Sequence, residues 1–375
     1  MGRTATCPYC WHSFKEDELL LFCSEVCAAG ERSFFAAKES SKGLCPHGRR
    51  PLPRRFCPDP DCHRALLREY VESHGRNVAV IGSADAGKTT YIGVLLHELQ
   101  GRVAAQFNGM ALDLLGDESR KNYSERFARP LFERREAVRK TARLEAGNNL
   151  DPLIFSLRIP TRGWFGRRLQ SMISVFYDAS GENVLTAQAM DPLVRYLEAA
   201  GGIVVLIDPM QMPRLRSRYG VAATPDTRER PVTDQHAIVQ RLAELLRESA
   251  TRSKAKLTVP LAIAITKLDL LSDSFEPESP LHRTPKHAGH YDEADGADVH
   301  EELRAWLERW FGPSFDNTVA ANFTVYRYFG LSALGAPPRD AVRLAESGVH
   351  PYRVEDPMLW LLARFGSIKS VKGRR

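Results

Sequence analysis

The sequence predicts an α/β domain with a six-stranded, mostly parallel sheet and helices on both faces, preceded by a small zinc-binding module. Three observations support this fold class. Strand-length apolar runs recur along the chain, a glycine-rich loop joins the first run to a helical segment, and all seven cysteines lie within the first 62 residues. The predicted divisions are a zinc-ribbon-like module at 1–66, a linker helix at 67–76 and the α/β domain at 77–375. Insertions are expected near 100–150, 210–235 and 273–300.

The cysteine module offers two sets of four metal ligands. The first set is Cys7, Cys10, Cys23 and Cys27, and the second is Cys45, His47, Cys57 and Cys62, with His63 as a substitute for His47. Thiolate and imidazole ligands at such spacings are typical of tetrahedral zinc. The odd cysteine count and the lack of a secretory segment after Met1 argue against disulfides. We therefore expect two structural zinc ions, because a segment this poor in core residues needs a cross-link.

The first apolar run, Asn77–Ile81, is rich in β-branched residues and predicts a buried parallel strand. It leads into the loop Gly82-Ser-Ala-Asp-Ala-Gly-Lys-Thr89, and the residues that follow predict a helix up to Leu99. A G-x-x-x-x-G-K-T pattern between a strand and a helix is that of a phosphate-binding loop. Its glycines let backbone N–H groups approach the phosphates, and the helix N-terminus favours an anion. The expected nucleotide contacts are Gly82, Asp85, Ala86, Gly87, Lys88, Thr89 and Thr90.

Three residues of this loop have individual expected roles. Lys88 is expected to bridge the β- and γ-phosphates, which makes it a candidate catalytic residue, and the Thr89 hydroxyl to ligate Mg²⁺. Asp85 offers an oxygen that could help to bind a monovalent cation. The alternative for Asp85 is a solvated loop aspartate.

Two further apolar runs, at 153–159 and 171–177, have no helix between them and predict an antiparallel hairpin across the Arg162–Arg168 turn. Asp178 follows the second run and can hold the Mg²⁺ shell through water. The backbone N–H of Gly181 can meet a γ-phosphate oxygen.

The next runs, at 202–207 and 260–265, complete the central strands, and the second ends at Thr266-Lys267-Leu268-Asp269. Ligands of open α/β sheets bind at the carboxyl edge of the strands. Asp269 can accept hydrogen bonds from the N1–H and the exocyclic amino group of guanine, a donor pair that adenine lacks. The aliphatic stem of Lys267 is expected over the base. The alternative for this motif is an ordinary surface loop.

A last predicted strand at 323–328 leads to a turn of small residues, Ser332-Ala333-Leu334. A backbone N–H of this turn can reach the carbonyl oxygen of guanine.

The ordered set of motifs resembles the translation-factor-related (TRAFAC) class of P-loop GTPases, which includes Ras-like and dynamin-like families. The form Thr266-Lys-Leu-Asp269 is similar to that of dynamin-like proteins. The N-terminal cysteine cluster and the ending Val354-Glu-Asp-Pro-Met-Leu-Trp360 resemble bacterial double-GTPase proteins, which are predicted parts of conflict or defence systems. The resemblance implies a Ras-like domain that binds GTP, hydrolyses it with Mg²⁺ and acts as a conformational switch.

The chain departs from the class pattern between the first helix and the third strand. A charged helical region is expected from Asp117 to about Leu144, in a segment much longer than a minimal domain uses. The switch threonine is assigned to Thr141, with Thr161 as the alternative. Glu182 stands where Ras-like proteins place the glutamine that orients water, and its charge next to a γ-phosphate predicts slow intrinsic hydrolysis.

The net charge of +6 and the clustered arginines would suit nucleic acid, anionic lipid or an acidic partner protein, or else a solvated surface. No apolar run reaches the ~20 residues of a membrane span, so a cytoplasmic location is expected. His287 and His290 are interpreted as a solvated loop. We expect a protein partner or self-association. Two alternatives to the switch remain, a GTP-binding scaffold with little hydrolysis and a nucleic-acid-binding zinc module with an attached NTPase.

Overall fold

The computed structural model forms two compact units, Met1–Gly75 and Arg76–Arg375, which are described separately. The residues whose structure is described are 4–23, 34–40, 43–45, 51–52, 54–72, 77–83, 85–107, 109–138, 152–163, 166–176, 192–219, 234–248, 256–285 and 287–372. None of the helices in these ranges combines the length and the apolar character that a bilayer span requires.

The first unit is built from short antiparallel strands. Strands β1 (Thr4–Thr6) and β2 (Ser13–Lys15) pair with each other. A second sheet has the order β4-β3-β5-β6, with bounds Phe34–Ala36, Leu20–Phe22, Arg54–Phe56 and Ala65–Leu66. The 3₁₀ turns η1 (Glu16–Glu18) and η2 (Ala37–Glu39) follow β2 and β4. Helix α1 (Arg68–Glu72), which falls in the predicted linker, contributes buried Val71 to the core of this unit.

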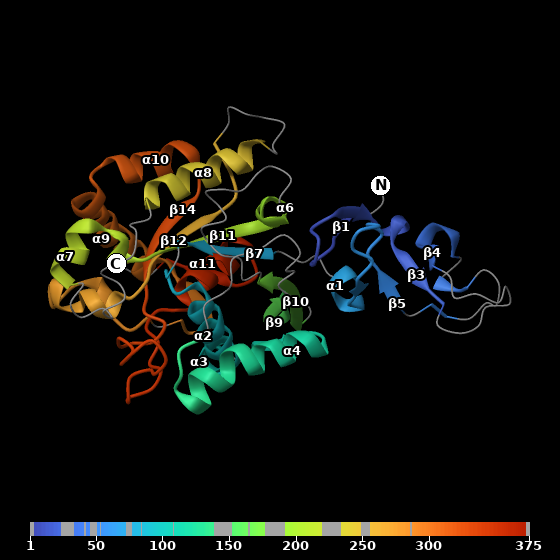
Figure 1. Ribbon diagram of the computed structural model, residues 1–375, viewed down its shortest axis with the longest axis horizontal. Coiled ribbons are helices and arrows are strands. Elements are labelled where there is room, and N and C mark those ends of the chain that lie inside the picture. Colours follow the sequence, from blue (N-terminus) through green and yellow to red (C-terminus); the bar gives the residue numbers. More distant parts are fainter. Residues whose placement is uncertain are drawn as a thin grey trace. The chain divides into compact units, whose positions relative to one another are not determined.

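The second unit contains a parallel sheet of order β14-β12-β11-β7 (Figure 1). Its strands are β7 (Asn77–Gly82), β11 (Ala200–Ile207), β12 (Leu261–Ile265) and β14 (Tyr326–Gly330). Nearly continuous apolar runs form these strands because both faces of the sheet are covered. The α/β class predicted from the sequence is confirmed.

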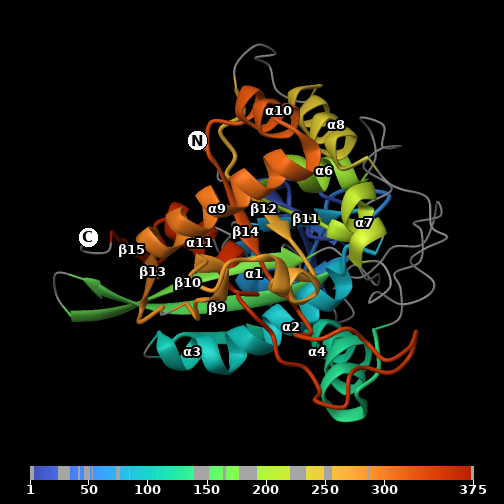
Figure 2. The ribbon, with the colours of Figure 1, turned by 90° about the vertical axis from the view of Figure 1, so that its left-hand side faces the viewer.

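A separate antiparallel sheet has the order β10-β9-β8, with bounds Gly166–Phe176, Leu153–Gly163 and Ala111–Leu114. The predicted hairpin is confirmed, since Gly163 is paired with Gly166 (Figure 2). Strand β10 lies alongside β7. The six predicted strands are therefore divided between two hydrogen-bonded sheets in the described ranges, and β8 is an additional strand that the sequence did not predict.

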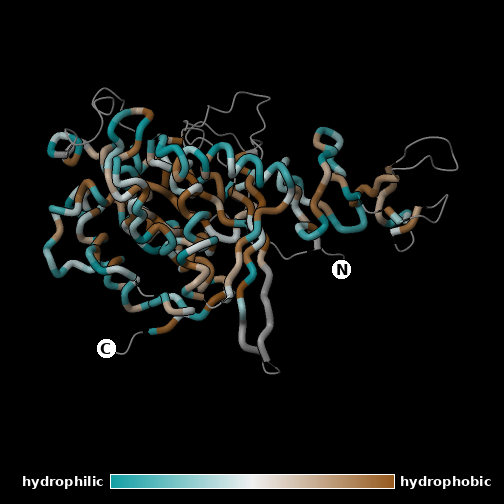
Figure 3. The backbone as a smooth tube through the Cα atoms, turned by 90° about the horizontal axis from the view of Figure 1, so that it is seen from below, coloured by the Kyte–Doolittle hydropathy of each residue, from teal (hydrophilic) through white to brown (hydrophobic). Residues whose placement is uncertain are grey.

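Helices cover both faces of the parallel sheet. Figure 1 shows α6 (Pro192–Glu198), α8 (Gln235–Glu248) and α10 (Ser314–Asn322) on one side, and α2 (Lys88–Gln100) and α3 (Arg102–Gln106) on the other. Hydrophobic residues are concentrated in the central segments (Figure 3). The remaining elements are α4 (Asp117–Tyr123), η4 (Ser124–Arg134), η5 (Pro209–Gln211), α7 (Pro213–Tyr219), η7 (Leu268–Ser274), η8 (Pro280–His282), β13 (His290–Asp292), α9 (Glu293–Phe311), α11 (Asp356–Arg364) and β15 (Lys369–Val371).

The charged helical insertion ends earlier than predicted. Segment η4 continues α4 and stops at Arg134, because Arg135 adopts a left-handed conformation with φ 54°. Buried Phe127 on η4 packs against Gly93 of α2, where a Cβ would stand 2.7 Å from the phenylalanine ring. This close approach fixes the insertion on the helix that follows the phosphate loop.

Candidate functional site

The loop between β7 and α2 has the backbone of a phosphate cradle. Gly82 ends β7, and a Cβ there would lie 2.8 Å from the carbonyl oxygen of Leu206, so the approach to β11 requires glycine. Asp85 and Gly87 have positive φ angles of 63° and 78°. Left-handed residues alternating with right-handed ones turn successive N–H groups toward one concavity, which binds anions. Asp85 is not glycine, and its strained backbone is a feature found mainly at functional sites.

Helix α2 begins directly at Lys88, so Lys88, Thr89 and Thr90 occupy its first turn. Lys88 is 8% exposed, and Ala86, just before it, is buried. An anion placed here would face the positive end of the helix dipole as well as the ammonium group. The geometry of this loop fits the phosphate contacts predicted for it, which stay predictions.

The segment after β12 presents the residues predicted to read the base. Thr266 is buried, and its hydroxyl donates a hydrogen bond to the carbonyl of Ile207 at 3.2 Å. Lys267 has φ 54°, which turns the chain sharply before η7 begins. Asp269 is half-buried on the first turn of η7, and no hydrogen bond or ion pair within the described ranges engages its carboxylate. It is therefore available to a ligand.

Asp208 is a site residue that the sequence analysis missed. It follows β11, is fully buried, and accepts hydrogen bonds from the backbone N–H of Met210 at 2.9 Å and from the Lys267 ammonium at 2.7 Å. Held in this way, the Lys267 side chain has a fixed direction, which limits where its aliphatic stem can lie. The only signal in the sequence is an acidic residue directly after a buried apolar run.

Replacing Asp208 with asparagine is expected to weaken guanine-nucleotide affinity about tenfold, equal to about 1.4 kcal/mol. Loss of the carboxylate frees the Lys267 ammonium, so the nucleotide must order that side chain on binding. Isothermal titration with GDP measures the change. Asp298→Asn is the matched control, because it removes an exposed aspartate–arginine pair at 2.8 Å and should leave the affinity unchanged. Unchanged affinity in Asp208→Asn would exclude this positioning role.

In the predicted turn after β14, the polar groups of Ser332 already form hydrogen bonds within the protein. The Ser332 N–H donates to the carbonyl of Tyr352 at 2.9 Å, and the Ser332 hydroxyl accepts from the Gly335 N–H at 2.9 Å. The backbone N–H groups of Ala333 and Leu334 make no such contact within the part of the chain that the structure describes. Of the three predicted residues, these two are the ones that can still donate to a base.

All these segments meet at one edge of the sheet. The parallel registers align Gly82 with Leu206, Ile207 with Ile265, and Ile265 with Gly330. The phosphate loop, Asp208, the Thr266–Asp269 segment and the Ser332 turn therefore all follow strand ends at the same carboxyl edge, where open α/β sheets bind ligands.

Four predicted residues, Thr141, Asp178, Gly181 and Glu182, lie outside the described ranges, as do Cys27 and His47. Thr161, the alternative switch threonine, belongs to β9 and is paired with Arg168 of β10.

The first unit brings four cysteines together, namely Cys7, Cys10, Cys57 and Cys62. The Sγ atoms of Cys7 and Cys62 are 3.8 Å apart, and those of Cys10 and Cys57 are 3.6 Å apart. Four thiolates at about 2.3 Å from one zinc ion stand roughly 3.8 Å from each other, so the set fits tetrahedral zinc and not two disulfides. Hydrogen bonds from Cys57 and Cys7 lower the pKa of the Cys10 thiol, and the same contacts raise the pKa of Cys7 and Cys57.

This grouping differs from the predicted one. Cys7 and Cys10 join Cys57 and Cys62, and Cys23 is not in the group, because Cys23 follows β3 while Cys57 follows β5, which pairs antiparallel with β3, so the two cysteines leave opposite ends of the strand pair. Cys23 and Cys45 are buried in the core of the same unit. His63 is exposed and stacks on Phe34, so it is not a member of the four-cysteine group. The predicted second set, Cys45, His47, Cys57 and Cys62, is therefore divided, because Cys57 and Cys62 belong to the four-cysteine group.

Cys57→Ser is expected to remove zinc from this group and to unfold the first unit, because structural zinc contributes about 10 kcal/mol or more to the folding of small domains. Metal analysis by mass spectrometry and proteolysis of residues 1–75 measure both effects. His63→Gln, adjacent to Cys62, is the control and should retain the metal. A Cys57→Ser protein with full zinc content would contradict the assignment.

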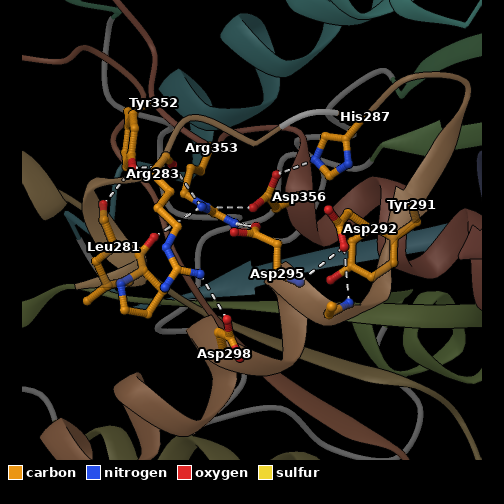
Figure 4. A network of polar contacts seen from close by, with 12 residues as sticks. Leu281, Arg283, His287, Tyr291, Asp292, Asp295, Asp298, Tyr352, Arg353 and Asp356 are labelled. Carbon is orange, nitrogen blue, oxygen red and sulfur yellow. Dashed lines mark hydrogen bonds and ion pairs between the residues drawn. The ribbon is translucent and has the colours of Figure 1, made fainter. Parts of the chain in front are cut away.

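His287 is not the solvated loop residue that was predicted. It is 1% exposed, and its Nε2–H donates to Asp356 at 2.9 Å, while Arg353 donates to the other oxygen of the same carboxylate at 2.7 Å (Figure 4). Burial opposes protonation of His287, but the hydrogen bond to Asp356 and the charges of Asp356 and Glu355 together outweigh it and raise the pKa of the ring. The prediction was wrong because a sequence rich in Pro, Gly and acidic residues is typical of an exposed loop. In the fold, this segment instead brings His287 to Asp356 at the start of α11. His290, by contrast, is partly exposed.

Comparisons with known proteins identify the family of the second unit. Residues 76–316 match the model of the family described as Double-GTPase 2. A proposed ESX-1 scaffolding and assembly protein, SaeC of Mycolicibacterium smegmatis, is 25% identical over 328 residues, covering 82% of this chain and 79% of its own.

Two solved structures show lower similarity. The Ski7 GTPase-like domain of S. cerevisiae bound to GTP has a TM-score of 0.28 at 14% identity, covering 69% of this chain and 43% of its own. The signal recognition particle receptor SRb-GTP/SRX complex from Chaetomium thermophilum has a TM-score of 0.32 at 13% identity, covering 71% and 94%.

Proposed function

Because the chain belongs to the double-GTPase 2 family, we propose that it binds GTP with Mg²⁺ and hydrolyses it as a conformational switch. The observation that carries the proposal is the common edge at which the phosphate loop and the Thr266–Asp269 segment both follow parallel strands. A triphosphate in the loop and a base at Asp269 can thus belong to one molecule.

The roles proposed for individual residues follow from this placement. Lys88 and the loop N–H groups contact the β- and γ-phosphates, and the hydroxyl of Thr89 is a ligand for Mg²⁺. Asp269 accepts from guanine, and Lys267, held by Asp208, lies along the base. Asp178, Gly181, Thr141 and Glu182 keep their predicted roles at the γ-phosphate as part of this proposal. Glu182 implies a slow intrinsic rate, raised by a partner or by self-association.

A scaffold that binds GTP with little hydrolysis is the second candidate, and the name of the mycobacterial relative favours it. In that case the nucleotide permits assembly with a protein partner, within a conflict or defence system and from a cytoplasmic location. A zinc module that binds nucleic acid is the third candidate, and its affinity would fall steeply with salt.

The experiment that tests the proposal is nucleotide binding by the purified protein, GTP against ATP, followed by single-turnover hydrolysis in K⁺ and in Na⁺. Preferential GTP binding with slow, measurable turnover supports the switch. GTP binding with no turnover, even in the presence of candidate partners, supports the scaffold. Equal affinity for ATP and GTP would overturn the guanine-specific function, and a rate well above the Ras-like basal scale would contradict the role given to Glu182.

A further inference from the structure

The outer edge of β7, opposite the edge that pairs with β11, is occupied by a side chain and not by a strand. Cα atoms of β10 come within 8 Å of β7, which is closer than the ~10 Å between stacked sheets, so β10 is a neighbour of this edge. No hydrogen-bonded ladder joins β10 to β7 within the described ranges. Instead, the Tyr196 hydroxyl of α6 accepts from the N–H of Val80 at 3.3 Å and donates to the carbonyl of Val78 at 3.1 Å.

This hydroxyl takes the place of one residue of a neighbouring strand. In a parallel pair, the Val78 carbonyl and the Val80 N–H would be bound by the N–H and the carbonyl of a single residue. A tyrosine hydroxyl is both a donor and an acceptor, so it satisfies the same two groups. Val78, Val80 and Tyr196 are all buried, so leaving these backbone groups unpaired would be costly. Strand β10 can therefore pair with this part of β7 only if the hydroxyl leaves.

Both α6 and β10 are connected to the segment proposed to contact the γ-phosphate. Strand β10 ends at Phe176, and α6 begins at Pro192. The chain between them carries Asp178, Gly181 and Glu182, which lie outside the described ranges. A parallel pair of β10 and β7 would bring the carboxyl end of β10 to the same edge as the phosphate loop, where ligands of open α/β sheets bind.

The strands that would move form one body. Strands β9 and β10 are paired along their full length, from the pair Leu153 and Phe176 to the pair Gly163 and Gly166 (Figure 2). The rings of Phe155 and Phe176 also pack against each other, with centroids 5.0 Å apart. The hairpin can thus shift along β7 without losing its own pairing.

We propose that Tyr196 and β10 replace each other at the outer edge of β7, and that the γ-phosphate favours the pairing of β10. The inference rests on the proposed function, because it assigns the switch its moving parts. The structure shows the arrangement in which Tyr196 holds the edge, and in the second arrangement β10 joins the parallel sheet. Since either occupant satisfies the same two backbone groups, the arrangements differ little in hydrogen bonding. A ligand that binds one of them better can therefore shift the populations.

Hydrogen exchange of the full-length protein, measured by mass spectrometry, tests the proposal. In the wild type, β10 peptides that cover 172–176 are compared in the presence of GDP and of a non-hydrolysable GTP analogue with Mg²⁺. They are expected to exchange at least about tenfold more slowly with the analogue, because new hydrogen bonds between strands must open first. This comparison needs no variant.

Tyr196→Phe keeps the ring and removes the hydroxyl, so β10 no longer has a competitor. In this variant β10 is expected to be protected from exchange even without nucleotide, and affinity for the GTP analogue should rise about tenfold relative to that for GDP. Tyr328→Phe is the matched control, because it removes another buried hydroxyl, which donates to Asp316 at 2.7 Å. Tyr328 lies on β14, at the opposite end of the sheet order from β7, so this variant should behave like the wild type.

The outcomes separate this inference from the proposed function. If the GTP analogue binds but β10 exchanges equally with both nucleotides, the inference is overturned while GTP binding stands. If the protein binds neither nucleotide, the proposed function fails, and the nucleotide-free comparison still decides whether the hydroxyl and β10 compete. Equal exchange of β10 in Tyr196→Phe and in the wild type, both without nucleotide, would exclude that competition.

Discussion

Replacing Lys88 with alanine is expected to lower the affinity for GTP at least about 100-fold, equal to about 2.7 kcal/mol. The ammonium is expected to make charge-assisted hydrogen bonds to two phosphates, each worth about 1.5–3 kcal/mol. Since Lys88 is 8% exposed and begins α2, the shortened side chain leaves a site that water reaches poorly. Titration with a fluorescent GTP analogue measures the loss.

The control for this variant is Lys121→Ala. Lys121 is an exposed lysine of α4, so its loss changes the net charge equally without touching the phosphate loop. It should bind GTP like the wild type. If Lys88→Ala also bound GTP like the wild type, the triphosphate could not lie in the loop between β7 and α2.

The parallel sheet was the part most open to prediction from sequence. A central strand that is buried on both faces requires an uninterrupted run of apolar residues. The runs predicted as strands at 202–207 and 260–265 correspond closely to β11 and β12. Strand β8 was missed because it has only four residues, Ala111–Leu114, with alternating burial inside a polar insertion. Local pattern therefore identifies strands in proportion to their length and burial, and it does not determine which sheet they join.

The parts that sequence could not supply depend on contacts between distant residues. Asp208 and Lys267 are 59 positions apart, and His287 and Asp356 are 69 apart. Cys7 and Cys57 share a cluster although they follow strands of different sheets, β1 and β5, whereas spacing alone favoured the nearer Cys23. In each case the residue type indicated a possible chemistry, but the partner was decided by the fold.

Changing Asp269 to asparagine is expected to reduce GTP affinity about 10–100-fold and to transfer the preference to xanthosine triphosphate. The carboxylate presents two acceptors to the N1–H and amino group of guanine, while an asparagine amide presents one acceptor and one N–H₂ donor. That donor would oppose the amino group of guanine, so one hydrogen bond is lost, the bond from N1–H no longer involves a charge, and a like-polarity contact is added, at about 1.5–3 kcal/mol. Xanthine carries a carbonyl at the same position and can accept from the amide.

The two halves of this result test different claims. Loss of GTP affinity alone would also follow from a distorted η7, whereas a gain of xanthosine triphosphate binding requires that the side chain at 269 face the base edge. Asp273→Asn, an exposed aspartate on the same η7, serves as the control and should retain the preference for GTP. Competition binding with the three nucleotides measures all variants. The substitution at residue 269 would exchange guanine for xanthine as the preferred base and would not affect the phosphate contacts. ATP affinity should therefore remain low in every variant. A rise in ATP binding would show that guanine is selected elsewhere in the site.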